Sequence, residues 1–317
     1  MKKFISQSVV FALITATLIV SFIGGLYSIQ SKASFKLSEG KHILILGDSH
    51  TRFAIDDNIF SRAENVSIGA EAYLYSYCKL KKFLEENEQM DTVILSFWGR
   101  NVRAGIDQWL FSESNMAERI PRYLPFMEKE EMAVFSEEKV AFVHAALHPE
   151  YMFLINMLRG KPLSCKALNI GAYRELHRDK LQEDIERRRG GNEPEAGSRE
   201  EDGDSINLAV YQKAYLLKIV ELCKSRDVEL ILLNTPTYKP EKYGDNEFAN
   251  DFHGAYMPDV KYMDYSAYPL PDSCYGDISH LNYRGARIFS QHLRERFSAD
   301  MKEIGAKNRW VYGETAE

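Results

Sequence analysis

Residues 42–50 read HILILGDSH, a short aliphatic run that stops at a glycine, an aspartate and a serine. An apolar run of this length, bounded by turn residues, is typical of a strand buried on both faces of a parallel sheet. Similar runs lie at 65–68, 92–97 (TVILSF) and 228–233 (VELILL), with a weaker one at 260–263. Since ligands gather at the carboxyl ends of parallel strands, Ser49 is predicted to face the crevice where a substrate binds.

Amphipathic helices alternate with these strands. Residues 73–87, 206–226 and 283–297 carry apolar side chains at three-to-four spacing with charges between them, the pattern of a helix packed on a sheet. The alternation predicts an α/β fold, a three-layer doubly wound parallel sheet of about five strands with flavodoxin-like topology.

Two stretches interrupt the alternation. Residues 104–169 are rich in aromatic residues and methionine and predict a helical insertion without a strand of its own, a candidate lid. Residues 182–205 contain three consecutive arginines and an acidic, glycine-rich tract with few apolar residues, so we expect a flexible loop there. We therefore divide the chain into an N-terminal segment, residues 1–31, and one domain, residues 32–317, that contains both stretches.

The N-terminal segment departs from the pattern of a soluble protein. A nearly unbroken apolar run from Val9 to Ile29 follows Met1-Lys2-Lys3 and is long enough to span a bilayer as a helix. Because the run exceeds the signal-peptide h-region of about 7 to 15 residues, we expect an uncleaved anchor. Small residues at 31–33 keep a cleaved signal peptide as the alternative. Lysines flank both ends, so the charge asymmetry is weak, and we expect the domain to face away from the cytoplasm.

Composition and the spacing of the cysteines argue against several classes of function. The 317 residues are 45% apolar, with a formal net charge of −6 and a pI near 5.8. This balance argues against a nucleic-acid partner, whose phosphates require clustered basic residues. The four cysteines are far apart and form no C-x-x-C pair, which argues against a zinc or redox site. Disulfide pairing and buried free thiols both stay open for Cys78, Cys165, Cys223 and Cys274.

Three residues together suggest nucleophilic chemistry. A serine hydroxyl becomes a good nucleophile when an imidazole takes its proton, and a carboxylate orients that imidazole. Residues 277–280 (DISH) supply both groups just before the last predicted helix. We therefore predict Ser49 as nucleophile, His280 as general base and Asp277 as the carboxylate. A helix-starting role for His280 is the structural alternative.

The GDS of residues 47–49 and the D-x-x-H of residues 277–280, followed by Leu-Asn, together resemble the SGNH, or GDSL-like, hydrolase superfamily. That superfamily has a glycine after the second strand and a G-x-N after the third, and both help to form an oxyanion hole. Gly69 and Asn101 occupy these places here. The resemblance thus implies that Gly69, Asn101 and the Ser49 backbone amide hold the oxyanion.

Three features depart from the superfamily's pattern. His50 stands where leucine is commoner, Gly69 lacks the fuller glycine motif, and Val102 replaces an aspartate after Asn101. The structural alternatives are a strand-end turn at Gly69 and a loop cap at Asn101.

Other histidines could suggest a metal site. His144 and His148 share a helical face but lack the glutamate of H-E-x-x-H, so a structural role is favoured. Metal ligation by Asp48 and His50 would leave the D-x-x-H motif without a role. We expect neither a metal nor a cofactor.

The resemblance implies acyl-ester chemistry. Membrane-anchored bacterial members of this kind modify envelope glycans, often beside a multi-spanning membrane protein that donates the acyl group. We expect hydrolysis or transfer of an acyl group, foremost acetyl, on a cell-envelope polysaccharide or glycoconjugate, by a catalytic domain that faces the periplasm or cell surface. The alternatives are a catalytically silent glycan-binding or assembly protein and a lipase or thioesterase at the membrane surface. Four aromatic residues of the insertion are candidates for sugar stacking or for helix packing, namely Trp109, Tyr123, Phe126 and Tyr151.

Overall fold

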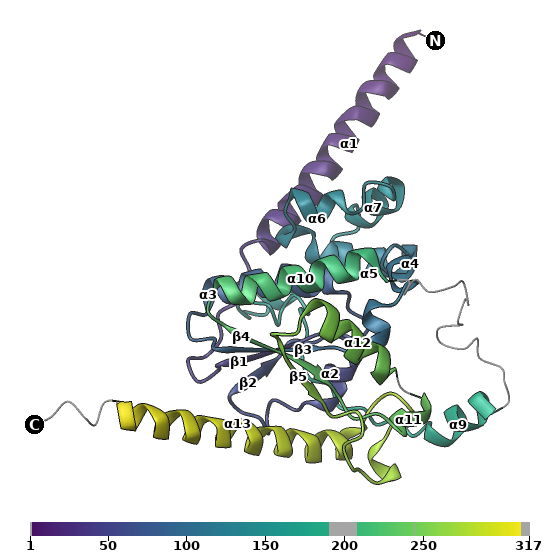
Figure 1. The fold of residues 1–317 in the computed structure, drawn as a ribbon. Coiled ribbons are helices and arrows are strands. Elements are labelled where there is room, and N and C mark those ends of the chain that lie inside the picture. The colour runs from purple at the N-terminus through teal and green to yellow at the C-terminus, as the bar shows by residue number, and fades with distance from the viewer. Residues whose placement is uncertain (1, 190–207, 244, 312–317) are drawn as a thin grey trace, which may run out of the picture.

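The computed structural model describes residues 2–189, 208–243 and 245–311. Its strands are β1 (Ile43–Leu46), β2 (Ala63–Asn65), β3 (Thr92–Ser96), β4 (Glu229–Asn234) and β5 (Lys261–Asp264). All neighbouring strands are parallel, in the order β2-β1-β3-β4-β5. The predicted α/β fold with a five-stranded parallel sheet is therefore confirmed (Figure 1).

Helices cover both faces of the sheet. The principal ones are α2 (Ser49–Ala54), α3 (Tyr73–Glu86), α10 (Val210–Ser225), α12 (Asn246–Tyr256) and α13 (Tyr283–Val311). The others are α1 (Lys2–Gln30), α4 (Ile106–Leu110), α5 (Glu113–Tyr123), α6 (Lys129–Ala133), α7 (Lys139–Ala146), α8 (Met152–Leu158), α9 (Leu181–Arg189) and α11 (Pro240–Tyr243), with short 3-10 turns η1 (Gly99–Val102), η2 (Leu124–Phe126) and η3 (Asp272–Cys274).

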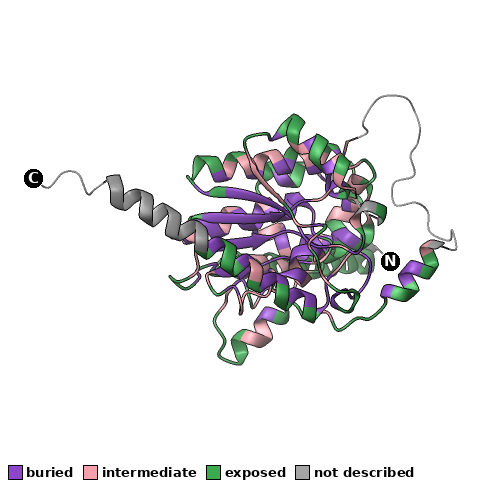
Figure 2. Ribbon diagram, turned by 60° about the horizontal axis from the view of Figure 1, so that its bottom comes forward, coloured by how far each residue is buried: buried purple, intermediate pink, exposed green. Residues whose placement is uncertain are grey.

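Alternate strand residues enter two separate cores. Leu44 and Leu46 of β1 pack with α3 and α10 on one face, whereas Ile43 and Ile45 pack with α13 on the other. This two-sided burial explains why the strand is apolar throughout rather than alternating. The buried sheet lies between its helical layers in Figure 2.

The second strand ends earlier than the predicted run at 65–68. β2 closes at Asn65, but the amides of Val66 and Ile68 still donate to Ile45 O and Gly47 O, at 2.9 and 3.0 Å. The chain therefore stays extended beside β1 until Gly69, and both chain segments reach the same edge of the sheet.

Residues 104–169 contain the helices α4 to α8, which extend the layer formed by α3 and α10 toward α1 (Figure 1). The expected flexible loop at 182–205 begins differently, because residues 181–189 form α9. The rest of that predicted loop, residues 190–205, lies outside the described residues. All four cysteines are buried free thiols, so the thiol alternative holds.

The helix α1 projects from the domain (Figure 1). Its segment Lys3–Gln30 is long and apolar enough to cross a membrane, with a mean hydropathy of 2.4 and only 6% of its most apolar window buried. Its last turns join the domain, where Leu26 is buried and the Tyr27 hydroxyl donates to Ala146 O at 2.8 Å.

Candidate active site

A tight turn carries Ser49 out of the sheet. Gly47 has φ +124°, and a Cβ there would lie 2.3 Å from Ser96 Cβ, so only glycine fits. Asp48 then caps α2, its carboxylate accepting the His50 amide at 3.0 Å. Ser49 is the first residue of α2, where a backbone N–H has no acceptor within the helix.

The structure brings the three predicted side chains into one hydrogen-bonded chain. His280 Nε2 lies 2.7 Å from Ser49 Oγ. His280 Nδ1 lies 2.9 Å from Asp277 Oδ1 and 3.1 Å from Oδ2. Ser49 and His280 are partly exposed, whereas Asp277 is buried. This is the order of contacts that lets an imidazole remove a hydroxyl proton while a carboxylate fixes its tautomer.

The surroundings of Asp277 favour its ionised form. Burial alone would raise its pKa, but the hydrogen bond and charge of His280, the Ser279 amide and the Arg178 guanidinium hold the pKa below its usual value. Oδ1 also accepts the amides of Ser279 and His280, both at 2.9 Å. A carboxylate held in this way stabilises the imidazolium that forms during proton transfer.

Asn101 reaches the same cleft from η1. Its Oδ1 accepts the Trp98 amide at 3.1 Å, and its Nδ2 donates to Asp48 Oδ2 at 3.0 Å. These bonds fix the side-chain amide and use one of its two N–H groups. Among the described residues the second N–H has no acceptor, so it can donate to a ligand in the cleft.

Gly69 lies against the nucleophile but does not line the main cleft. A Cβ on Gly69 would lie 3.9 Å from Ser49 Cβ. Its neighbour Ala70 lines the cleft and adopts φ +56°, a left-handed conformation that is unusual for alanine. The backbone therefore turns sharply beside Ser49, at the place where the superfamily has its glycine.

The cleft beside Ser49 has a volume of about 500 Å³. Ser49 and His280 border it together with Asn101, two tryptophans and two arginines. The lining residues outside the triad include Trp98, Trp109, Arg100, Arg103, Ala70 and Gln212. A cavity of this size accepts a sugar-sized or larger ester group.

The other histidines that were weighed as metal ligands, His144, His148 and His50, make contacts within the protein. His148 Nδ1 lies 2.8 Å from His144 O, within one helical turn. His50 is buried against the Trp98 ring, and burial, opposed by the Asp48 charge, lowers its pKa to about 4. The described residues hold no group of three metal-ligating side chains.

The four aromatic candidates of the insertion separate by position. Tyr123 and Phe126 are buried and pack its helices. Trp109 lines the cleft, and Tyr151 is exposed on the surface of the insertion. Only Trp109 of these lies where it can contact a substrate in the cleft.

Sequence reasoning missed two parts of the site. The carboxylate of Asp48 accepts hydrogen bonds from Ser96 Oγ at 2.8 Å and from Trp98 Nε1 at 3.0 Å, besides the one from Asn101 Nδ2. Residues 171–180, before α9, run past the triad, and Arg178 lies 3.4 Å from Asp277. Gly276 was the available signal for that close approach, because a Cβ there would lie 2.7 Å from Leu176 Cδ2 and 3.1 Å from Arg178 O.

Comparison with known proteins gives distant structural similarities. A candidate acylhydrolase from Bacteroides fragilis NCTC 9343 matches 84% of this chain and 93% of its own, with 12% identity and a TM-score of 0.37. A GDSL-like lipase from Bacteroides thetaiotaomicron VPI-5482 matches 86% and 97%, with 10% identity and a TM-score of 0.32. A family model that carries no descriptive name matches residues 167–302, less than half of the chain. No curated protein matches in sequence. The candidate site therefore rests on the contacts among its own residues.

Proposed function

We propose that this protein is a serine-dependent acyl-ester enzyme of the SGNH type that hydrolyses or transfers an acyl group, foremost acetyl, on a cell-envelope polysaccharide or glycoconjugate. The observation that carries the proposal is the continuous hydrogen-bonded chain from Ser49 through His280 to Asp277. Such a chain activates a hydroxyl for attack on a carbonyl carbon.

The reaction follows from these contacts. Ser49 Oγ bonds to the ester carbonyl carbon as His280 Nε2 takes the hydroxyl proton. The tetrahedral oxyanion is held by the Ser49 amide, the Gly69 region and the second N–H of Asn101. The C–O bond to the leaving alcohol then breaks, and His280 returns the proton to that alcohol. Water, or a sugar hydroxyl, finally attacks the acyl carbon with His280 again as base. The bond from that carbon to Ser49 Oγ breaks, and His280 returns the proton to Ser49.

The glycan substrate is supported by the family resemblance and by the open cleft. The cleft is bordered by Trp98 and Trp109, whose rings suit sugar faces. A multi-spanning membrane protein beside α1 would supply acyl groups in a transferase, whereas a hydrolase needs none.

The test is p-nitrophenyl acetate hydrolysis by the full chain, beside Ser49→Ala and His280→Ala. We expect turnover in the parent and loss in both variants, together with fluorophosphonate labelling that requires Ser49. A folded parent that neither turns over the ester nor becomes labelled would instead favour a silent binding protein. In cells, Ser49→Ala should change the O-acetyl content of a surface glycan.

We also propose that α1 holds the domain outside the cytoplasm as a single-pass anchor. The exposed apolar surface of α1 supports the anchor. Protease added to intact spheroplasts should digest the domain, and the protein should stay with the membrane after an alkaline wash. Release by the wash would indicate a cleaved signal peptide.

A further inference from the structure

Four arginines gather next to the nucleophile, around Gly69. The Gly69 Cβ position lies 3.6 Å from Arg52 Nη1, and Arg119 Nη2 donates to Gly69 O at 2.6 Å. The Arg174 amide donates to Arg52 O at 3.2 Å, and Arg122 follows Arg119 by one turn of α5. We call Arg52, Arg119, Arg122 and Arg174 the arginine cluster. Because Arg52 follows Ser49 by three residues in α2, both side chains share one face of that helix.

The carboxylates near the cluster are already engaged. Glu118 lies 3.3 Å from Arg119 and 4.0 Å from Arg122. Glu71 is buried and bonds Lys79 at 2.6 Å, besides the hydroxyls of Ser76 and Tyr123. In the part of the chain that the structure describes, the guanidinium groups of Arg52 and Arg174 have no carboxylate or carbonyl partner.

The cluster is electrostatically unfavourable without an anion. Arg52 Nε and Arg119 Nε have no solvent access and no acceptor within the described ranges, and Arg119 is only 2% exposed. Burial, followed by the charges of Arg174, Arg119 and Arg122, lowers the pKa of Arg52. Arg119 is buried but bonds Gly69 O and lies 3.3 Å from Glu118, whereas Arg52 is half-buried and Arg174 is exposed. A bound anion would therefore offset the repulsion between Arg52 and its neighbouring arginines.

We propose that the arginine cluster binds an anionic substituent, a carboxylate or a phosphate, of the glycan whose ester reacts at Ser49. Guanidinium groups match the planar or tetrahedral oxygens of both anions. This inference rests on the proposed function and names its substrate class as acidic glycans. Arg52 and Arg174 contact the anion, while Arg119 and Arg122 add positive charge behind them.

Direct binding tests the cluster independently of turnover. The full chain carrying Ser49→Ala would be titrated with three oligosaccharides of one length: a uronic-acid glycan, a phosphorylated glycan and a neutral glycan. We expect an acidic ligand to bind at least about tenfold more tightly than the neutral one. Arg52→Gln and Arg174→Gln should each remove most of that difference.

The matched control is Arg226→Gln, an exposed arginine that ends α10 at the opposite edge of the sheet. It should keep the preference for acidic ligands. Equal affinities for acidic and neutral glycans, or a preference that survives both cluster substitutions, would overturn the inference. The carboxylate and phosphate arms identify which anion fits. Ester turnover by the parent reports separately on the proposed function.

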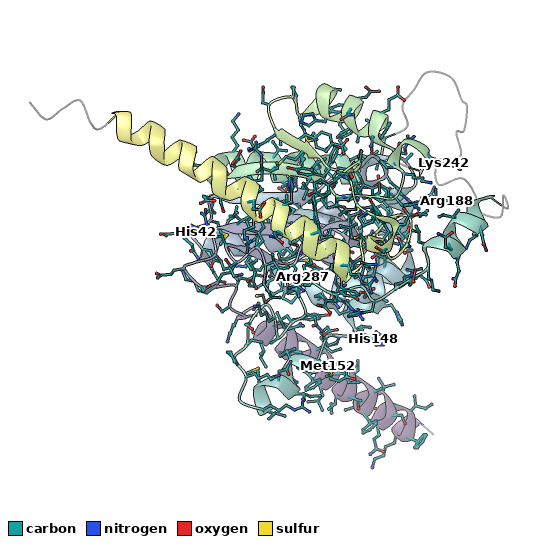
Figure 3. The ribbon with its side chains drawn as sticks, turned by 90° about the horizontal axis from the view of Figure 1, so that it is seen from below. His42, His148, Met152, Arg188, Lys242 and Arg287 are labelled. Atoms are coloured by element: carbon teal, nitrogen blue, oxygen red, sulfur yellow. The ribbon has the colours of Figure 1, made fainter. Side chains whose placement is uncertain are left out.

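A second surface, on the helical insertion, exposes apolar side chains beside α1. Val140, Val143 and Leu147 of the α7 region are 85%, 54% and 47% exposed, and Tyr151, Met152 and Leu158 of the α8 region are 63%, 48% and 88% exposed. We call these six residues the insertion patch. The Tyr27–Ala146 hydrogen bond joins α7 to the last turns of α1. Figure 3 shows Met152 close to α1.

We infer that the insertion patch lies in the interface of the bilayer that α1 crosses. The apolar surface of α1 is exposed from Phe4 to Phe22 and becomes buried in the domain at Leu26, so the membrane surface lies near the level of α7. Exposed charges of both signs flank the patch, with Lys139, Arg159 and Lys161 on one hand and Glu137 and Glu138 on the other, so the inference rests on the apolar surface.

Site-specific labelling tests this docking. The native cysteines are buried, so Leu158→Cys or Val140→Cys in the full chain can be labelled selectively with an environment-sensitive dye. In nanodiscs with brominated lipids we expect strong quenching at both positions. The control is Arg287→Cys, labelled in Figure 3, on α13, which lies on the other side of the sheet from α1 (Figure 1) and should stay unquenched. Equal quenching at all three positions, or none at 140 and 158, would refute the inference.

Discussion

Two aspartate–histidine pairs flank Ser49, and they are built in opposite ways. His280 is partly exposed and contacts Ser49 Oγ, while Asp277 Oδ1 accepts a hydrogen bond from His280 Nδ1. His50 is buried, 4% exposed, and its ring lies against the rings of Trp98 and His280, with centroids 4.4 and 5.1 Å away. Asp48 uses its carboxylate for Ser96, Trp98 and Asn101. The same two residue types therefore contact the Ser49 hydroxyl in one pair and bond the surrounding chain in the other, and we propose proton transfer for the first pair and positioning for the second.

The largest expected contrast lies between the two histidines. His280→Ala should lower kcat for ester hydrolysis by about four to six orders of magnitude, because the nucleophile loses its base. His50→Gln should lower it by less than about tenfold, since His50 does not contact Ser49 Oγ. Steady-state kinetics with p-nitrophenyl acetate measures both. Comparable losses would show that the two pairs act as one unit.

The aspartates should differ in the kind of damage that substitution causes. Asp277→Asn should reduce kcat by about 10⁴-fold, because the amide favours the wrong tautomer of His280. Asp48→Asn places an N–H group among several donors and should lower the free energy of unfolding by at least about 2 kcal/mol. Kinetics and urea unfolding, run on both variants, separate the effects. A stable Asp48→Asn protein would contradict the positioning role of this carboxylate.

Asn101→Ala extends the comparison, because Asn101 bonds Asp48 and borders the same cleft as Ser49 and His280. It removes one proposed oxyanion donor and one donor to Asp48. We expect kcat to fall by about 10²- to 10³-fold while KM changes little, since the oxyanion forms only in the transition state. Asn101→Asp provides a control of similar shape that repels the oxyanion and should be at least as impaired. A variant affected only in KM would place Asn101 in ground-state binding.

The fold, and the grouping of Ser49, His280 and Asp277 at one edge of the sheet, were predictable because their signals are local. Aliphatic runs such as residues 43–46 mark buried strands directly, and the D-x-x-H spacing sets Asp277 and His280 on one turn. The order of strands and motifs along the chain then fixes which edge of the sheet they share. These features need no knowledge of distant contacts.

The environment of Asp48 was not predictable in the same way. Its hydrogen-bond donors come from residues 96, 98 and 101, which are brought near only by the pairing of β1 with β3. The arginine cluster likewise joins α2, α5 and a segment before α9. Its members are scattered single arginines in the sequence. Contacts between distant segments of the chain decide which residues lie beside them, and no periodic pattern in the sequence indicates those contacts.

The smallest effect expected is an acid-dependent loss of stability that belongs to the buried pair. The pKa of His50 falls from its ordinary value of 6.5 to about 4 in the folded protein. Between these values the unfolded chain binds a proton that the folded protein does not. The stability that depends on a neutral His50 is therefore fully present above about pH 6.5. The free energy of unfolding decreases as the pH falls toward 4, by at most about 3 kcal/mol.

Replacing His50 isolates that contribution. His50→Gln cannot take up the proton, so its free energy of unfolding should depend less steeply on pH between about 6.5 and 4 than that of the parent. Asp277, whose pKa is also lowered, loses stabilisation in acid in both proteins. The pKa of Asp48 is lowered partly by the charge of His50, so the variant also weakens the acid dependence that comes from Asp48. Urea unfolding at several pH values measures the difference. If the parent and variant curves run parallel, burial does not keep His50 neutral, and the contrast with His280 must come from its contacts alone.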